Sequence, residues 1–133
     1  MIEEFLKFFS QINFFDIIFI VRIYLVTDMF YFDFCDRCIT AGISIPVVPG
    51  VLPVTNLAQI QRITSLCGAK LPETFVKRLE EKGEDNSDWQ FEVGVEFAAA
   101  QVKELIDQGA AGVHFYVLNK SQATLRVLEA VDW

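Results

Sequence analysis

Three short apolar runs alternate with helical patterns along the chain, and this alternation restricts its fold more than any other feature. The runs span residues 17–26, 43–48 and 113–118 and are rich in the residues typical of strands buried on both faces. Strands that alternate with helices pair in parallel through right-handed crossovers. The sequence therefore predicts an α/β fold with a parallel sheet. This pattern fits an open doubly wound sheet or a barrel, and no Gly-rich dinucleotide fingerprint follows any run.

Five helices are predicted between and after the strands. Their approximate bounds are residues 31–41, 56–66, 72–82, 87–109 and 121–131. Asn56 is placed to cap the second helix, with Gln59 three residues on, and Ser87 with Gln90 matches the capping box at the start of the fourth. The Pro49-Gly50 pair is expected to close the second strand.

The charge and the cysteines narrow the class of protein. A net charge of −7 and eleven Lys and Arg without a dense cluster make nucleic acid an unexpected partner. Three cysteines are an odd number in a chain that needs no disulfides, which fits a reducing compartment, and cytoplasm is the expected location. Cys35 and Cys38 have the CxxC spacing, but they fall inside a helical pattern and are interpreted as ordinary helix cysteines.

The N-terminal segment differs in composition from the rest of the chain. The first 34 residues hold nine of the thirteen phenylalanines. Their most apolar window is interrupted by Lys7, Asp16 and Arg22, and a charge near the middle of a bilayer costs roughly 2.5 to 3.5 kcal/mol on insertion scales. A membrane span is therefore not expected, although a membrane-associated protein anchored by this segment remains one alternative.

Each predicted strand ends in residues that are unusual for a strand. Asp28 follows the first strand, Pro49 to Pro53 follow the second, and Asn119 and Lys120 follow the third. The carboxyl ends of parallel strands meet on one face of a sheet, where sites usually form. We expect a carboxylate, a rigid turn, an amide and a cation to face one cleft. Two plainer alternatives remain: Asp28 caps the next helix, and Lys120 is a solvated loop lysine.

His114 is the only histidine and lies within the third strand. It shares one face of that strand with Tyr116 and Leu118, since side chains alternate between faces. A lone strand histidine is more often a hydrogen-bonded core residue than a catalyst. A structural role is therefore predicted for His114.

Three segments at these strand ends resemble the methylenetetrahydrofolate reductase family, the flavin enzymes that reduce methylenetetrahydrofolate to methyltetrahydrofolate. Residues 26–31, Val-Thr-Asp-Met-Phe-Tyr, resemble its Thr-Gln-x-Phe segment. Residues 45–54 resemble its Pro-Gly-Ile-Leu-Pro segment, and residues 114–120 its His-Phe-Tyr-Thr-Leu-Asn-Arg segment. They stand in the family's order, and the likeness runs from about residue 25 to the C-terminus.

The resemblance implies a (β/α)8 TIM barrel with FAD at the carboxyl ends of its strands. Hydride would pass from NADH or NADPH to the flavin and then to folate, and this chain would supply the last three βα units. The family's folate-contacting Gln and Arg correspond to Asp28 and Lys120. Lysine keeps the positive charge without the planar fork of arginine, and an ionised aspartate cannot donate a hydrogen bond. The family's acid-base glutamate has no counterpart here, so no catalytic residue is assigned, and no metal site is expected.

The resulting prediction divides the chain at residue 25. Residues 1–24 form an atypical Phe-rich segment, and residues 25–133 form an incomplete barrel, since a complete (β/α)8 barrel takes at least roughly 200 residues. The chain is expected to be an enzyme fragment that is inactive alone. The alternative is a non-catalytic half-barrel module that binds itself or a longer relative through an exposed sheet edge.

Overall fold

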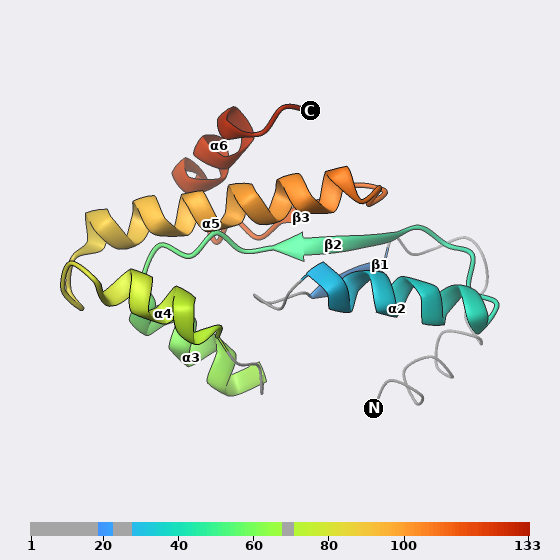
Figure 1. The fold of residues 1–133 in the computed structure, drawn as a ribbon, viewed down its shortest axis with the longest axis horizontal. Coiled ribbons are helices and arrows are strands. Elements are labelled where there is room, and N and C mark those ends of the chain that lie inside the picture. The colour runs from blue at the N-terminus through green and yellow to red at the C-terminus, as the bar shows by residue number, and fades with distance from the viewer. Residues whose placement is uncertain (1–18, 23–27, 68–70) are drawn as a thin grey trace.

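The computed structural model describes residues 19–22, 28–67 and 71–133 (Figure 1). Three strands and five helices lie in these residues. In chain order they are β1 (Phe19–Arg22), α2 (Asp28–Thr40), β2 (Val47–Val51), α3 (Leu57–Cys67), α4 (Glu73–Glu80), α5 (Ser87–Asp107), β3 (His114–Phe115) and α6 (Ser121–Ala130). The alternation of strands and helices expected from the sequence is therefore present.

The three strands form a parallel sheet in the order β1-β2-β3. Phe19 pairs with Val47 in the first ladder, and Gly50 pairs with His114 in the second. The third strand is shorter than the predicted run of residues 113–118, because only His114 and Phe115 have strand geometry. One further hydrogen bond, from Tyr116 N to Val51 O at 2.9 Å, extends the pairing before the chain turns away.

The Pro49-Gly50 pair does not close the second strand, as the sequence suggested, but lies inside β2. Proline lacks an N–H and normally disrupts a central strand. Here β3 pairs only with Gly50 and Val51, so beside Pro49 the ladder involves β1 alone. Gly50 is needed for a different reason: the ring of Tyr116 occupies the space that a Cβ at this position would take.

One helical layer packs on one face of the sheet. Helices α2, α5 and α6 share a core with β2, and α5 runs antiparallel to β2 along its length (Figure 1). Val47, Val51 and Phe115 join this core. Because side chains alternate along a strand, His114 and Tyr116 belong to the opposite face. Their rings meet edge to face with centroids 5.0 Å apart, and both side chains are half-buried.

A second core lies beside the first, beneath α3 and α4. Its buried members are Val54, Leu57, Ile60, Phe75, Leu79 and Val93. Phe75 of α4 stacks on Phe97 of α5, with ring centroids 4.1 Å apart. This core fixes the segment that follows β2 against α5.

Helix α2 is tied to the sheet through a buried tyrosine. The Tyr31 hydroxyl donates to the carbonyl of Val47 over 2.8 Å, and burial raises the pKa of this phenol. The helix ends before Gly42, which adopts a φ of +81° as expected for a residue that stops a helix. Cys35 lies in the second half of α2 and Cys38 in its last turn; both are free thiols, and burial raises the pKa of both.

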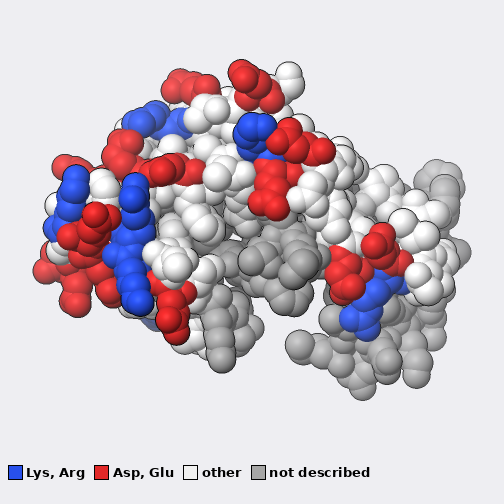
Figure 2. All heavy atoms as spheres, viewed as in Figure 1, with Lys and Arg blue, Asp and Glu red and all other residues white. Residues whose placement is uncertain are grey.

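The surface carries no continuous basic patch on the face shown in Figure 2, where Lys and Arg lie among more numerous Asp and Glu over α4, α5 and α6. This distribution agrees with the net charge of −7. Within residues 19–22, 28–67 and 71–133, none of the helices combines the length and apolar character that crossing a membrane requires.

Candidate functional site

The loop after β2 and the turn after β3 enclose a small cavity of about 30 Å³. Its walls come from residues 52–56, from the first turns of α3 and α6, and from residues 116–118. The polar members among its lining residues are Thr55, Asn56, Gln59, Tyr116, Lys120 and Thr124. The predicted convergence of the second and third strand ends is therefore present in the structure.

The turn after β3 has an unusual backbone. Lys120 N donates to Val117 O over 2.9 Å, and the two residues between them have positive φ, 49° at Leu118 and 60° at Asn119. Asparagine tolerates this left-handed conformation, whereas for leucine it costs roughly 1–2 kcal/mol. Backbone strain of this kind tends to occur at functional sites. Here it directs the chain sharply from the sheet into α6.

Helix α6 begins without a side-chain cap. Its N-cap residue is Lys120, whose side chain makes no capping hydrogen bond and is exposed to solvent. A lysine has no acceptor for the first N–H groups of a helix, and its charge opposes the helix dipole. Serine, threonine or aspartate at this position would stabilise the helix by about 1 kcal/mol relative to a residue without a cap. The first N–H groups of α6 therefore have no side-chain acceptor from the N-cap residue.

The opposite wall of the cavity is held in place by two amides. Asn56 caps α3 as predicted, accepting from Gln59 N over 2.8 Å. Gln90, which is 1% exposed, accepts from Leu57 N over 2.9 Å and donates to Glu84 O over 2.6 Å. Its predicted part in a capping box with Ser87 is wrong. Asn86 caps α5 instead, accepting from Trp89 N over 3.1 Å, because the buried Gln90 side chain is engaged with α3 and the preceding loop.

A glycine allows α5 to approach the same loop closely. A Cβ added at Gly94 would overlap the carbonyl oxygen of Val54. Gly94 is itself buried in the middle of α5. The backbone at Val54 thus lies directly against α5.

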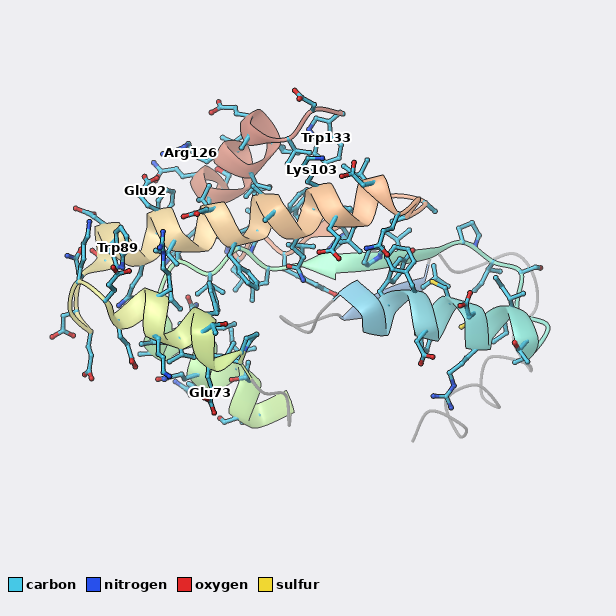
Figure 3. The ribbon with its side chains drawn as sticks, viewed as in Figure 1. Glu73, Trp89, Glu92, Lys103, Arg126 and Trp133 are labelled. Carbon is cyan, nitrogen blue, oxygen red and sulfur yellow. The ribbon has the colours of Figure 1, made fainter. Side chains whose placement is uncertain are left out.

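A larger hollow of about 790 Å³ adjoins the cavity and shares Thr55, Asn56 and Lys120 with it. Its outer wall carries Asp88 and Glu92 at the start of α5. Glu92 is held by Arg126 of α6 through two hydrogen bonds of 2.9 and 3.2 Å, and the two side chains point toward one another in Figure 3. Lys120 is the one cationic residue among those that line this hollow in the described part of the chain.

Thr124 is a cavity residue that sequence reasoning missed. It is 8% exposed, and its Oγ1 is buried with no hydrogen-bond partner among the described residues. Gln59 was considered only for its position near the helix cap, although it also lines the cavity. Their role depends on a cavity that forms between distant segments.

The structure places the two predicted site residues differently. Lys120 lines the cavity at the end of β3. Asp28 is the first residue of α2, after β1, but its side chain and residues 23–27 lie outside the described part of the structure. The predicted meeting of Asp28 with Lys120 stays a prediction. His114, expected to be structural, makes a ring contact with Tyr116 and is not among the cavity residues.

The described side chains of this cavity favour a particular ligand chemistry. An ammonium group, three hydroxyl groups and two amides can all donate hydrogen bonds. A carboxylate or an amide carbonyl is the complementary acceptor. Apolar residues, among them Leu52, Ile60, Ile63 and Ala123, make up the rest of the lining.

Comparison with known proteins identifies similar sequences. A family model described as methylenetetrahydrofolate reductase matches residues 17–132. The chain is 30% identical over 97 residues to the 5,10-methylenetetrahydrofolate reductase of Escherichia coli (strain K12), covering 73% of this chain and 32% of that protein. It is 33% identical over 98 residues to the protein of that name from Pectobacterium carotovorum, with 73% and 32% covered.

A plant protein gives a longer match. The chain is 29% identical over 109 residues to methylenetetrahydrofolate reductase (NADH) 1 of Arabidopsis thaliana, covering 78% of this chain and 18% of that protein. The chain thus spans about a third of the length of the bacterial relatives that it matches, and less of the plant relative.

Proposed function

The chain belongs to the methylenetetrahydrofolate reductase family, and on this premise we propose that it forms the folate-binding side of a barrel that reduces 5,10-methylenetetrahydrofolate to 5-methyltetrahydrofolate. One observation carries the proposal. The loop after β2 and the turn after β3, which are the two segments with the strongest family likeness, meet at one cavity lined by Asn56, Gln59 and Lys120. A site for a ligand with amide, ring-nitrogen and carboxylate groups needs such a set of convergent polar groups.

We propose that the three βα units are the last three of a (β/α)8 barrel. Support comes from the parallel sheet with strands in sequence order, and from a helical layer on one face of it. In a barrel, helices cover the outside and the other strand face is directed inward. His114 and Tyr116 would then be interior barrel residues, and the cavity would lie at the carboxyl-terminal end, where sites in this fold form.

Within this site, Lys120 would bind a carboxylate of the folate glutamate tail. It acts as a point charge, since a lysine lacks the two-pronged geometry of the arginine in the family segment. Asp28 would stand at the carboxyl end of β1, as the first residue of α2. An ionised Asp28 could accept a hydrogen bond from the amino group of the pterin ring, but it could not donate one.

The flavin of this family does not fit the described residues alone. The cavity of about 30 Å³ has room for only one or two water molecules, at roughly 10–15 Å³ each, and not for a flavin ring. The adjoining hollow has room, but Asp88 and Glu92 on its wall would repel a diphosphate. We therefore propose that further strands provide the flavin and NAD(P)H sites, and that residues 19–22, 28–67 and 71–133 do not catalyse the reduction by themselves.

The location proposed for the protein is the cytoplasm, where its substrate would meet NAD(P)H. Cys35 and Cys38 are free thiols in the structure, which fits a reducing compartment. Both lie in α2, away from the cavity residues of the β2 and β3 ends.

A hybrid enzyme tests the proposed function. Residues 25–133 would replace the matching segment of the Escherichia coli relative, so that the remaining strands come from that protein. The hybrid should retain FAD and reduce methylenetetrahydrofolate, whereas the chain alone should be colourless and should not oxidise NADH with a flavin-type acceptor. A hybrid that folds and retains FAD but binds no folate would overturn the proposal, as would a yellow isolated chain bleached by NADH.

A further inference from the structure

The sheet and the helical layer end on the same side of the molecule. Strand β3 is the last strand in the order β1-β2-β3, and α6 ends the helical layer, with α5 between it and α2 (Figure 1). The Tyr116 N–H is directed at Val51 of β2, and successive amides of a strand alternate in direction. The N–H and the carbonyl of Phe115 therefore face the open edge of the sheet. An open edge of this kind is a template for a further strand.

Helix α6 carries apolar side chains outside its contact with α5. Arg126 marks the side turned toward α5, where it is bonded to Glu92. Leu128 follows two residues later, which places it about 160° around the helix from Arg126. Leu125, one turn before Leu128, also lines a groove of about 310 Å³ that Phe91 of α5 borders. The apolar surface therefore runs from this groove to the side of α6 that faces away from α5.

This surface is continuous along the helix. Leu125 and Leu128 are neighbours at a spacing of three residues and are 54% and 37% exposed. Trp133 is 66% exposed, and its ring is held at the end of α6 by a hydrogen bond from its Nε1 to Leu128 O over 3.1 Å. Single exposed apolar residues are normal, whereas contiguous ones often mark an interaction site. We call these three side chains the α6 surface.

The occupant of the α6 surface has to extend the sheet and the helical layer together. A βα unit does this, because its strand pairs with β3 while its helix packs on α6. In a (β/α)8 barrel the first βα unit has this place, since closure pairs the last strand with the first. The chain spans about a third of the length of the bacterial relatives, so those proteins are long enough to hold the remaining units outside the matched segment.

A second copy of this chain matches the surface less well. Each copy carries a net charge of −7, so two copies repel one another. Each described sheet has three strands, and no multiple of three gives the eight strands of the barrel. A different polypeptide is therefore the better partner.

We propose that the open edge of β3 and the α6 surface form a docking site for the first βα unit of a second polypeptide, which carries the remaining strands of the barrel. This proposal rests on the proposed function, because it takes the chain as the last three units of that barrel, and it adds the partner and the contact surface. The strand of the partner extends the sheet at Phe115, and its helix buries Leu125 and Leu128. Two chains together then complete the barrel.

Assembly from two separate chains tests the docking site. The Escherichia coli relative without its matching segment is co-expressed with the full chain, the complex is captured through a tag on this chain, and its Kd is measured by dilution. The double variant Leu125→Gln/Leu128→Gln removes apolar surface without a change of charge and should raise the Kd about tenfold or more. Leu66→Gln is the control and should leave the Kd within about twofold, because Leu66 is 79% exposed on α3, away from the end of the layer.

Thermal unfolding separates docking from a role in the fold of this chain. In the chain alone both leucines are exposed, so the double variant should keep its Tm within about 1 °C. In the hybrid enzyme the same leucines are covered by the first βα unit, so the double variant should lower the Tm by at least about 3 °C. A loss in both proteins would assign the leucines to the fold of this chain, and a loss in neither would show that the α6 surface stays in solvent. Either result would overturn the docking site.

The remaining outcomes separate this proposal from the proposed function. Failure of the two wild-type chains to assemble would overturn the docking site, and the hybrid enzyme then decides the proposed function separately. Light scattering of the chain alone identifies self-association: a dimer that the double variant dissociates would make a second copy the occupant and overturn the proposal. A complex that assembles through Leu125 and Leu128 but binds no folate would overturn the proposed function and leave the docking site standing.

Discussion

The backbone N–H of Leu57 donates to the side-chain oxygen of Gln90 over 2.9 Å, across 33 residues of sequence. This buried bond joins the first residue of α3 to the first turn of α5. The nitrogen of the same side chain donates to Glu84 O over 2.6 Å, so one amide links two helix starts and the loop between α4 and α5.

Replacing Gln90 should destabilise the fold strongly. Gln90→Leu leaves the buried Leu57 N–H without a partner, and a buried unsatisfied group costs about 1–3 kcal/mol, whereas the carbonyl of the exposed Glu84 can bond to water. We expect the free energy of unfolding to fall by about 1–3 kcal/mol in urea titrations. Gln108→Leu is the matched control, since Gln108, the C-cap residue of α5, is exposed and its side chain donates to the exposed Glu104. A similar small loss in both variants would contradict the structural role of Gln90.

Gly94 should tolerate no side chain. Gly94→Ala places a methyl group against the Val54 carbonyl, and such overpacking costs about 1–3 kcal/mol although alanine is the better helix former. Gly112→Ala provides the comparison, because no atom lies within 4 Å of its added Cβ. Its unfolding free energy should change by less than about 0.5 kcal/mol. Chemical denaturation of both variants measures the difference, and a stabilised Gly94→Ala would disprove the close approach.

The positions of the strands could be predicted from the sequence more accurately than the residues at which each strand begins and ends. Residues 17–26, 43–48 and 113–118 were expected as strands, and each contains or overlaps an observed strand of the parallel sheet. The second strand was expected to end before Pro49-Gly50, but β2 continues through this pair. A proline disrupts a strand only where a neighbouring strand would accept a hydrogen bond from its N–H. That need depends on where β3 begins, which is a property of the pairing and not of the local sequence.

The Ser87 and Gln90 capping box failed for a related reason. The two residues have the spacing of a capping box. In the structure the Gln90 side chain instead accepts a buried hydrogen bond from Leu57 N, and Asn86 caps α5. At the candidate site, the position of Lys120 beside the cavity could be predicted because the residue directly follows a predicted strand. Thr124 could not, since its significance lies in a hydroxyl group that tertiary packing buries without a partner.

The thiols of α2 should react slowly in the folded chain. Burial raises the pKa of Cys35 and Cys38, so the reactive thiolate is scarce at neutral pH. In a Cys67→Ser background, alkylation by iodoacetamide at pH 7.5 should be at least about tenfold slower than in urea. Equal rates in the folded and unfolded chain would contradict the burial of these thiols.

The same shift predicts how stability depends on pH. The folded chain holds the thiol protons more tightly than the unfolded chain, because both pKa values are raised. This contribution to stability is fully present below the thiol pKa of the unfolded chain and is lost as the pH rises through the raised values. Substituting Cys35 and Cys38 by Ala should reduce the loss of unfolding free energy that occurs as the pH rises into the alkaline range. An unchanged loss in the variant would show that groups other than these thiols cause it.

Lys120→Arg should strengthen folate binding in the hybrid enzyme. The planar guanidinium group offers two parallel hydrogen bonds to a carboxylate, where the ammonium group of lysine offers a point charge. We expect the Kd for 5-methyltetrahydrofolate to fall several-fold, with little effect on the Kd for NADH. Titration calorimetry measures both constants. A weaker binding of folate would show that the carboxylate is not the group that Lys120 meets.

The central claim, that the end of β3 is the folate side of the site, is tested most directly by Lys120→Ala in the same hybrid. The Kd for 5-methyltetrahydrofolate and for NADH would be measured side by side, with Lys103→Ala as the control because Lys103 lies exposed on α5 and pairs with Asp107 (Figure 3). Loss of a charge-assisted hydrogen bond should weaken folate binding about tenfold or more, leaving NADH binding within about twofold. Equal losses for the two ligands, or no loss for folate, would contradict the claim.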